Sequence, residues 1–334
     1  MILALLEHGG RLRQAAALYN IPLENWVDLS TGINPNGWPV PPCPASSWSR
    51  LPEDDDGLTA IAKTYYGARH ILPVAGSQAA IQALPRLCTL KNETKIGVLY
   101  PGYSEHMHAW REYGYNAHPI DGANIDGQID DLGVLVLINP NNPTGQSFSV
   151  AQLLEWHGEL SARGGWLIVD EAFMDATPEL SLIPYTDRTG LIVLRSLGKF
   201  FGLAGARVGF VASDPDLLSG LNTQLGPWTI NGPARRVAGE ALKDINWQDA
   251  TRNRLSGESD RLRELLIRHG LAPTGGSALF HWVRQQNASE IHAALGQEGI
   301  LTRLFSDPNS LRFGLPGRED EWARLDFALG KVSL

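Results

Sequence analysis

Short apolar runs alternate with longer segments of helical spacing through the middle of the chain. The apolar runs cover residues 96–99, 134–138, 166–169, 191–194 and 208–212. Segments between several of them, for example residues 149–163, repeat apolar positions as an amphipathic helix does. Strands that alternate with helices form mostly parallel sheets. The pattern therefore predicts an α/β fold, with a large domain whose mostly parallel sheet is flanked by helices.

The two ends of the chain depart from this alternation. Near the start, residues 35–44 are rich in proline, so neither a helix nor a sheet ladder can continue through them. Near the other end, a long charged helical pattern at residues 249–269 precedes apolar runs at 279–283 and 311–314. We predict three parts, which are an N-terminal arm (1–45), a large domain (46–228) and a small α+β C-terminal domain (229–334).

Polar motifs directly follow four of the apolar runs. They begin at Tyr100, Asn139, Asp170 and Ser196. Ligands of open α/β sheets bind beyond the carboxyl ends of the strands. The topology therefore predicts that the four motifs form one site.

Lys199 follows the buried run at residues 191–194 and precedes a glycine-rich return that contains Arg207. Burial and a neighbouring cation both lower the pKa of a lysine, and the neutral amine can then form a Schiff base with an aldehyde. Pyridoxal phosphate (PLP) is the usual aldehyde of this kind. We therefore predict Lys199 as a catalytic residue that binds PLP.

Two further strand-end residues suit the same cofactor. Asp170 could pair with a pyridine nitrogen and keep it protonated, which makes the ring an electron sink. Taken alone it has a helix N-cap or a turn aspartate as the alternative. Asn142 lies in a turn fixed by prolines and could meet a ring hydroxylate, although a simple turn is the alternative.

A phosphate site is expected at Gly76, Ser77 and Gln78, where a helical segment begins. The start of a helix offers free N–H groups and a favourable dipole to an anion, while ordinary capping is the alternative. Ser196 and Arg207 would complete the site, the arginine through a charge-assisted pair of hydrogen bonds.

Tyr103 and Arg312 are candidates for the ring and for the substrate. Tyr103 could stack on the ring face, or be an exposed turn residue. Arg312 is a charge inside an apolar strand, and buried arginines generally need an anion. A substrate carboxylate fits, and an internal salt bridge is the alternative.

Composition excludes several partners. The net charge is −8 over 334 residues with no basic block, so we expect no nucleic-acid partner. No run approaches the roughly 18 apolar residues of a membrane helix, so we expect no membrane partner. The two cysteines, Cys43 and Cys88, lack metal-ligand or redox spacing, which indicates a cytoplasmic protein.

No metal site is predicted. His106 and His108 are two residues apart on an expected helix and point to different faces, so we interpret them as structural or surface residues. The acidic run at residues 53–56 lacks the spacing of a calcium loop and is interpreted as a solvated turn.

Together these residues resemble the fold-type I PLP enzymes, in the histidinol-phosphate aminotransferase-like branch, over nearly the whole chain. Residues 139–145, 170–172 and 196–209 are the most specific parts. The resemblance implies the PLP-dependent transferase fold and a homodimer with sites near the interface. It implies Lys199 as the Schiff-base lysine, Asp170 at the pyridine nitrogen, Asn142 at the ring oxygen, Tyr103 on the ring, Gly76, Ser77, Gln78, Ser196 and Arg207 at the cofactor phosphate, and Arg312 at the substrate carboxylate.

Several segments look like the L-threonine-O-3-phosphate decarboxylases of cobalamin biosynthesis. They are residues 8–11, 28–35, 170–173 and 227–231. Phe173 stands where histidinol-phosphate aminotransferases usually have a tyrosine, which would donate to the ring oxygen as phenylalanine cannot. The resemblance implies decarboxylation of L-threonine O-3-phosphate to (R)-1-amino-2-propanol O-2-phosphate. The alternative is an aminotransferase acting on histidinol phosphate or a related phosphorylated amine.

The substrate phosphate would bind to the N-terminal arm, where His8, the backbone at Gly9 and Asn34 are candidates. The chain also departs from the family pattern at three positions. Gly32 replaces an asparagine near the substrate, and Leu51 replaces a tyrosine that reaches the partner subunit's cofactor phosphate. Gly198 replaces a small polar residue beside the lysine.

Overall fold

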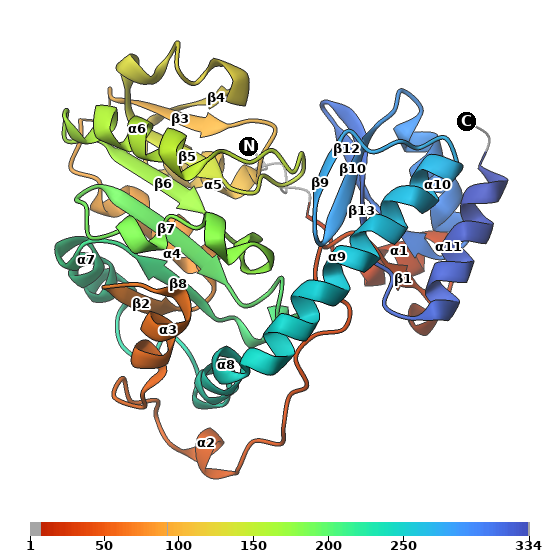
Figure 1. Ribbon diagram of the computed structural model, residues 1–334, viewed down its shortest axis with the longest axis horizontal. Coiled ribbons are helices and arrows are strands. Elements are labelled where there is room, and N and C mark those ends of the chain that lie inside the picture. Colours follow the sequence, from red (N-terminus) through yellow and green to blue (C-terminus); the bar gives the residue numbers. More distant parts are fainter. Residues whose placement is uncertain (1–7, 92, 333–334) are drawn as a thin grey trace. The chain divides into compact units, whose positions relative to one another are not determined.

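The computed structural model describes residues 8–91 and 93–332, shown in Figure 1. Its contacts divide the chain into two compact units. The larger unit contains residues 37–142 and 147–250, and the smaller contains the chain up to residue 36, residues 143–146 and the chain from residue 251. The domain boundaries at 45/46 and 228/229 stay a prediction.

A seven-stranded sheet forms the centre of the larger unit, in the order β2-β8-β7-β6-β5-β3-β4. The strands are β2 (Ile71–Val74), β3 (Lys95–Leu99), β4 (Asn116–Ile120), β5 (Leu132–Ile138), β6 (Trp166–Asp170), β7 (Leu191–Ser196) and β8 (Gly209–Ala212). Strands β4, β3, β5, β6 and β7 are parallel, and β8 is antiparallel to both of its neighbours. The predicted mostly parallel sheet is confirmed.

Helices cover the sheet because its strands are apolar on both faces, as the buried run of β5 illustrates. On one face, α4 (Ser77–Leu87), α5 (Ser104–Glu112) and α7 (Pro215–Leu225) share a core with the strands. Helix α6 (Val150–Ser161) packs against β5 and β6. The remaining helices of this unit are α2 (Ser46–Ser49), α3 (Leu58–Tyr66) and α8 (Gly232–Lys243).

The sequence pattern does not predict β4. His118 and Pro119 interrupt its apolar positions, so the segment lacks the continuous run of the inner strands. Strand β4 lies at the edge of the sheet, where a proline is tolerated because one side of the strand has no ladder to complete.

The smaller unit contains a four-stranded antiparallel sheet in the order β12-β13-β10-β9. These strands are β9 (Gly275–Ser277), β10 (Phe280–Arg284), β12 (Arg303–Ser306) and β13 (Asn309–Gly314). Strand β1 (Val27–Asp28) pairs in parallel with β11 (Ile300–Leu301), so the start of the chain joins the C-terminal part. The helices are α1 (Leu12–Tyr19), α10 (Ala288–Gln297) and α11 (Glu319–Lys331), and α9 (Ile245–Arg268) runs across the division between the units.

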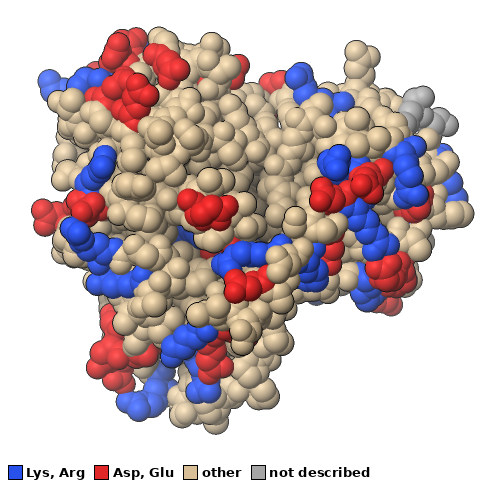
Figure 2. Space-filling view, in the orientation of Figure 1, with Lys and Arg blue, Asp and Glu red and all other residues tan. Residues whose placement is uncertain are grey.

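Basic and acidic side chains are interspersed on the face that Figure 2 shows. Within the described part of the chain, none of the helices combines the length and the apolar character needed to cross a membrane.

Candidate active site

A cavity of about 150 Å³ lies at the carboxyl ends of β5, β6 and β7. Its walls are Gly76, Ser77, Gln78, Tyr103, Ile138, Asn142, Asp170, Ala172, Phe173, Ser196, Gly198, Lys199, Leu203, Ala204, Arg207 and Val208. The structure therefore brings together all the sequence-predicted residues of the larger unit.

The register of the parallel strands explains why these motifs meet. Ile138 of β5 lies opposite Asp170 of β6, which lies opposite Leu194 of β7. The ladder continues for one more residue on each side of β6, since the Asn139 N–H donates to the Asp170 backbone carbonyl and the Glu171 N–H donates to the Leu194 backbone carbonyl, both at 2.9 Å. The polypeptide leaves all three strands at their carboxyl ends, on the same side of the sheet, as parallel topology requires.

Asp170 is held from behind by a histidine. The carboxylate is 4% exposed, its Oδ1 accepts from the Ala172 N–H at 3.0 Å, and its Oδ2 lies 3.0 Å from Nε2 of buried His106. The sequence pattern predicts a structural or surface role for His106 and does not predict this contact. The signal was its spacing, because His106 comes one helical turn after Tyr103 and so lies on the same side of α5.

Lys199 lies in a tight turn after β7. The Gly198 N–H donates to Ser196 Oγ at 3.2 Å, and the Lys199 carbonyl accepts from the Gly202 N–H at 3.1 Å. The side chain is half-buried, with Nζ 5.4 Å from the centre of the Phe173 ring, within cation–π range. The turn thus directs an amine along an apolar ring into the cavity.

Another part of the cavity wall is suited to an anion. Helix α4 begins directly after Gly76, whose φ is 73°, and the Arg207 guanidinium packs on that glycine. A Cβ at Gly76 would lie only 2.8 Å from Arg207 Nη2. The first N–H groups of α4 and the guanidinium therefore converge, and both favour negative charge.

A series of hydrogen bonds links Tyr103 and Gln78 in the cavity wall to Glu105, which does not line the cavity. The Tyr103 hydroxyl donates to Gln78 Oε1 at 3.0 Å, and Gln78 Nε2 donates to Glu105 Oε2 at 2.7 Å. Burial, followed by the charge of Glu105, raises the pKa of Tyr103 to about 12. Because the Gln78 side chain is used in this way, it is the Gln78 backbone N–H that belongs to the anion wall.

The loop that carries Asn142 is fixed by its neighbours. Asn141 Nδ2 donates to the Pro101 carbonyl at 2.8 Å, which joins the loops after β5 and β3. Asn139 Oδ1 accepts from the Phe148 N–H at 3.0 Å and closes the turn. Asn142 is thereby presented at the cavity wall.

The other predicted residues belong to the smaller unit. Arg312 on β13 is 4% exposed, it donates through Nη2 to the Ser30 carbonyl, and it lies 5.1 Å from the centre of the Phe280 ring. Burial, with a contribution from the charge of Arg303, lowers the pKa of Arg312 to about 9.

Gly9 also lies against Ser30, since a Cβ at Gly9 would overlap the Ser30 carbonyl. The structure therefore brings Gly9 and Arg312 to the same residue. Asn34 is 2% exposed, and its Oδ1 accepts from Arg254 Nη2 at 3.0 Å and from the Asn36 N–H at 3.1 Å. His8 is half-buried.

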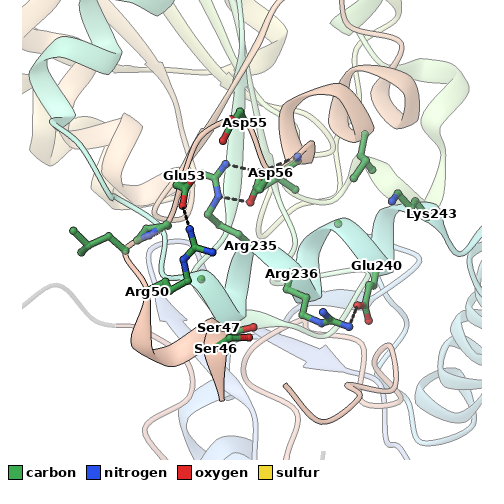
Figure 3. Close-up of a pocket in the computed structure, with 16 residues that line it drawn as sticks. Ser46, Ser47, Arg50, Glu53, Asp55, Asp56, Arg235, Arg236, Glu240 and Lys243 are labelled. Atoms are coloured by element: carbon green, nitrogen blue, oxygen red, sulfur yellow. Dashed lines mark hydrogen bonds and ion pairs between the residues drawn. The ribbon is translucent and has the colours of Figure 1, made fainter. Parts of the chain in front are cut away.

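A second cavity of about 450 Å³ lies beside α2 and α8 in the larger unit (Figure 3). Most of the charged side chains that line it form ion pairs. Arg235 contacts Asp56 at 2.7 and 2.8 Å and Asp54 at 3.1 Å. Two more pairs are Arg50–Glu53 at 2.6 Å and Arg236–Glu240 at 2.8 Å.

The acidic run at residues 53–56, interpreted as a solvated turn, contains both an exposed side chain and one that is bound to an arginine. Asp54 is 88% exposed in its side chain, whereas Asp56 closes a two-point contact with buried Arg235. Among residues 8–91 and 93–332, no group of three or more His, Cys, Asp or Glu side chains is placed to hold a metal.

Comparison with known proteins finds relatives that match this chain over nearly all of its residues. The chain is 56% identical over 325 residues to threonine-phosphate decarboxylase of Pseudomonas aeruginosa, covering 97% of each chain. It is 38% identical over 336 residues to the protein of that name from a Sinorhizobium species, covering 98% of each.

Among solved structures, histidinol-phosphate aminotransferase from Sinorhizobium meliloti, determined in complex with pyridoxal-5'-phosphate, superposes with a TM-score of 0.79. The match covers 98% of this chain and 94% of that one at 19% identity, and it supports the predicted fold. The family model for aminotransferase class I and II matches residues 55–330. This chain therefore belongs to the class I and II aminotransferase family.

Proposed function

We propose that the protein is a PLP-dependent decarboxylase that converts L-threonine O-3-phosphate to (R)-1-amino-2-propanol O-2-phosphate in cobalamin biosynthesis. The observation that carries this proposal is the 56% identity to threonine-phosphate decarboxylase over 97% of both chains. The cavity at the ends of β5, β6 and β7 supplies the chemistry that such an enzyme needs.

The residues around this cavity fit PLP at both ends of the cofactor. At one end, Gly76 and the first turn of α4 leave space for an anion next to Arg207, a space that a Cβ at Gly76 would fill. Ser77, Gln78 and Ser196 line the same wall. At the other end, the acceptor is the carboxylate of Asp170, which suits a protonated pyridine nitrogen. Lys199 is the amine that would hold the aldehyde.

Bound PLP supplies a ring that takes up the electrons released when a bond at the substrate Cα breaks. Asp170 would hold a proton at the ring nitrogen, and its contacts with His106 and the Ala172 N–H fix the carboxylate in one orientation. Tyr103 would cover one face of the ring and exclude water from it. Asn142 would donate to the ring oxygen.

The substrate carboxylate would bind Arg312. Burial in the smaller unit leaves this arginine weakly solvated, which strengthens its interaction with an anion. His8, the Gly9 backbone and Asn34 are the candidates for the substrate phosphate. Once carbon dioxide has left, Lys199 in its protonated form would deliver a proton to the substrate carbon that carried the carboxylate.

An aminotransferase acting on histidinol phosphate or a related amine would use the same cofactor-binding residues. In that reaction Lys199 would remove the Cα proton, and an oxo acid would be required. Phe173 favours the decarboxylase, since it stands where histidinol-phosphate aminotransferases carry a tyrosine hydroxyl.

One incubation distinguishes the decarboxylase from the aminotransferase. PLP-loaded protein is mixed with L-threonine O-3-phosphate without any oxo acid, and carbon dioxide and aminopropanol phosphate are followed over many turnovers. We expect sustained release of both, and little from L-threonine, which lacks the phosphate. A single conversion of the cofactor to its amine form without carbon dioxide would contradict the proposal and make histidinol phosphate with 2-oxoglutarate the next pair to assay.

We propose that the protein is a homodimer in the cytoplasm. Large apolar side chains are exposed on the larger unit at Trp48 (72%), Leu51 (64%) and Trp228 (59%), and a second copy would cover them. Cys43 and Cys88 are both free thiols, which supports a reducing compartment. Light scattering should give twice the mass of the chain, and a monomer would contradict the dimer.

A further inference from the structure

Glu105 is a buried carboxylate that does not line the cavity. It is the second residue of α5 and is 8% exposed. A buried carboxylate is costly unless it is hydrogen-bonded, and Glu105 accepts from Gln78 Nε2 at 2.7 Å. Gln78 in turn contacts Tyr103, which does line the cavity. A residue outside the cavity is therefore connected to one in its wall through a single amide.

The amide of Gln78 can face either way unless something selects one direction. An ionised carboxylate only accepts hydrogen bonds, so Glu105 requires the NH₂ group of Gln78 to face it. The Gln78 carbonyl oxygen must then face Tyr103, whose hydroxyl becomes the donor, as the 3.0 Å contact shows. The charge of Glu105 thus determines the direction of both hydrogen bonds, the one from Gln78 to Glu105 and the one from Tyr103 to Gln78.

We propose that Glu105 is a positioning residue that, by orienting the Gln78 amide, holds the Tyr103 ring in place for the cofactor and keeps its hydroxyl proton directed to Gln78 Oε1. This inference rests on the proposed function only for the identity of the cofactor, PLP. The proposal gives Gln78 two roles. Its backbone N–H belongs to the anion wall, and its side chain accepts the hydrogen bond from Tyr103.

The substitution E105Q tests the proposal because it keeps the shape of the side chain and removes the charge. The amide introduced at this position can both donate and accept, so the Gln78 amide is free to turn and Tyr103 loses its fixed partner. We expect E105Q to weaken PLP binding to the apoprotein roughly threefold to tenfold, the range expected for one net hydrogen bond. The absorption band of the bound cofactor should shift as well.

A double-mutant cycle identifies the route of the effect. Y103F removes the hydroxyl that donates to Gln78. In the Y103F background, E105Q should therefore reduce the affinity for PLP little further. The matched control is E112Q, the same substitution at an exposed position at the other end of α5, and it should leave PLP binding unchanged. If E105Q does not fold, Q78M removes the same two hydrogen bonds and should reproduce the weakened binding.

Two results would overturn the proposal. The first is wild-type PLP affinity in E105Q, which together with a lower melting temperature would mean a purely structural role. The second is an E105Q effect that persists in full with Y103F, since Glu105 would then not act through Tyr103. A wild-type protein that takes up no PLP would remove the proposed function itself, and this inference with it.

Discussion

Two cavities in the larger unit differ in how their charged side chains are used. In the cavity of about 450 Å³, Arg235 is bound by Asp56 and Asp54 and further ion pairs line the wall. In the cavity of about 150 Å³, the buried carboxylate of Asp170 is bound by a histidine and a backbone N–H. The smaller cavity is lined by an amine, a carboxylate and an anion wall, so the arrangement of its groups, and not its volume, supports the proposal that it is the active site.

The largest effect should come from K199A. Removing the amine proposed to hold PLP should reduce activity at least about 10³-fold, because no other group at this position can take its place. The free energy of unfolding should change by less than about 1 kcal/mol, since the side chain is only half-buried. Steady-state kinetics and urea unfolding measure the two quantities.

The matched control is K243A, which removes an exposed lysine from the larger cavity. It should leave activity unchanged. If K243A were inactive and K199A active, the assignment of the two cavities would be reversed.

The next largest effect should be on stability and should come from R235A. The guanidinium is 5% exposed, and its removal leaves two carboxylates without their partner. Breaking a buried ion pair costs about 3–5 kcal/mol, and about 2–3 kcal/mol is expected here because Asp54 and Asp56 are partly solvated. Urea unfolding measures the loss, while kcat per folded molecule should be retained.

The exposed pair Arg236–Glu240 supplies the control. E240Q should cost less than about 0.5 kcal/mol, as surface pairs do. A fully stable R235A protein that had lost PLP binding would show instead that the larger cavity serves the cofactor.

The smallest effect concerns pH and a histidine outside both cavities. Burial lowers the pKa of His157 on α6, whose ring nitrogen lies 3.0 Å from the Thr189 carbonyl. Between the folded pKa and the unfolded value near 6.5, the unfolded chain binds more protons. The contribution of neutral His157 to the free energy of unfolding is therefore fully present above pH 6.5, and it is lost as the pH falls through the pKa of His157 in the folded protein.

Urea unfolding at pH 7.5 and pH 5.5 checks this expectation. H157Q keeps a donor for Thr189 and should lose less stability on acidification than the wild type does. H118Q, at a half-buried position on edge strand β4, is the control. Equal losses in the wild type and H157Q would show that His157 does not contribute.

The sequence predicts the cavity wall well because its signals are local. Asp170 and Lys199 each follow a continuous apolar run, and parallel topology alone brings the ends of such runs together. The anion wall is predicted in the same way from the glycine before α4.

Two contacts between distant residues were harder to predict. His106 meets Asp170 across 64 residues, and Arg235 meets Asp56 across 179. Spacing places His106 on the Tyr103 side of its helix, but the group that it meets there, like the partner of Arg235, depends on how the helix packs, which periodicity does not determine. Edge strand β4 was missed for another reason, since an edge tolerates the proline that a central strand excludes.

The most direct test of the account is to identify the lysine that binds PLP. Borohydride reduction of the PLP-loaded protein fixes the cofactor on that lysine, and peptide mass spectrometry locates it. We predict a pyridoxyl group on the peptide that contains Lys199, with K199A unlabelled. A label on Lys243, or equal labelling of K199A and the wild type, would contradict the claim that the cavity at the strand ends is the active site.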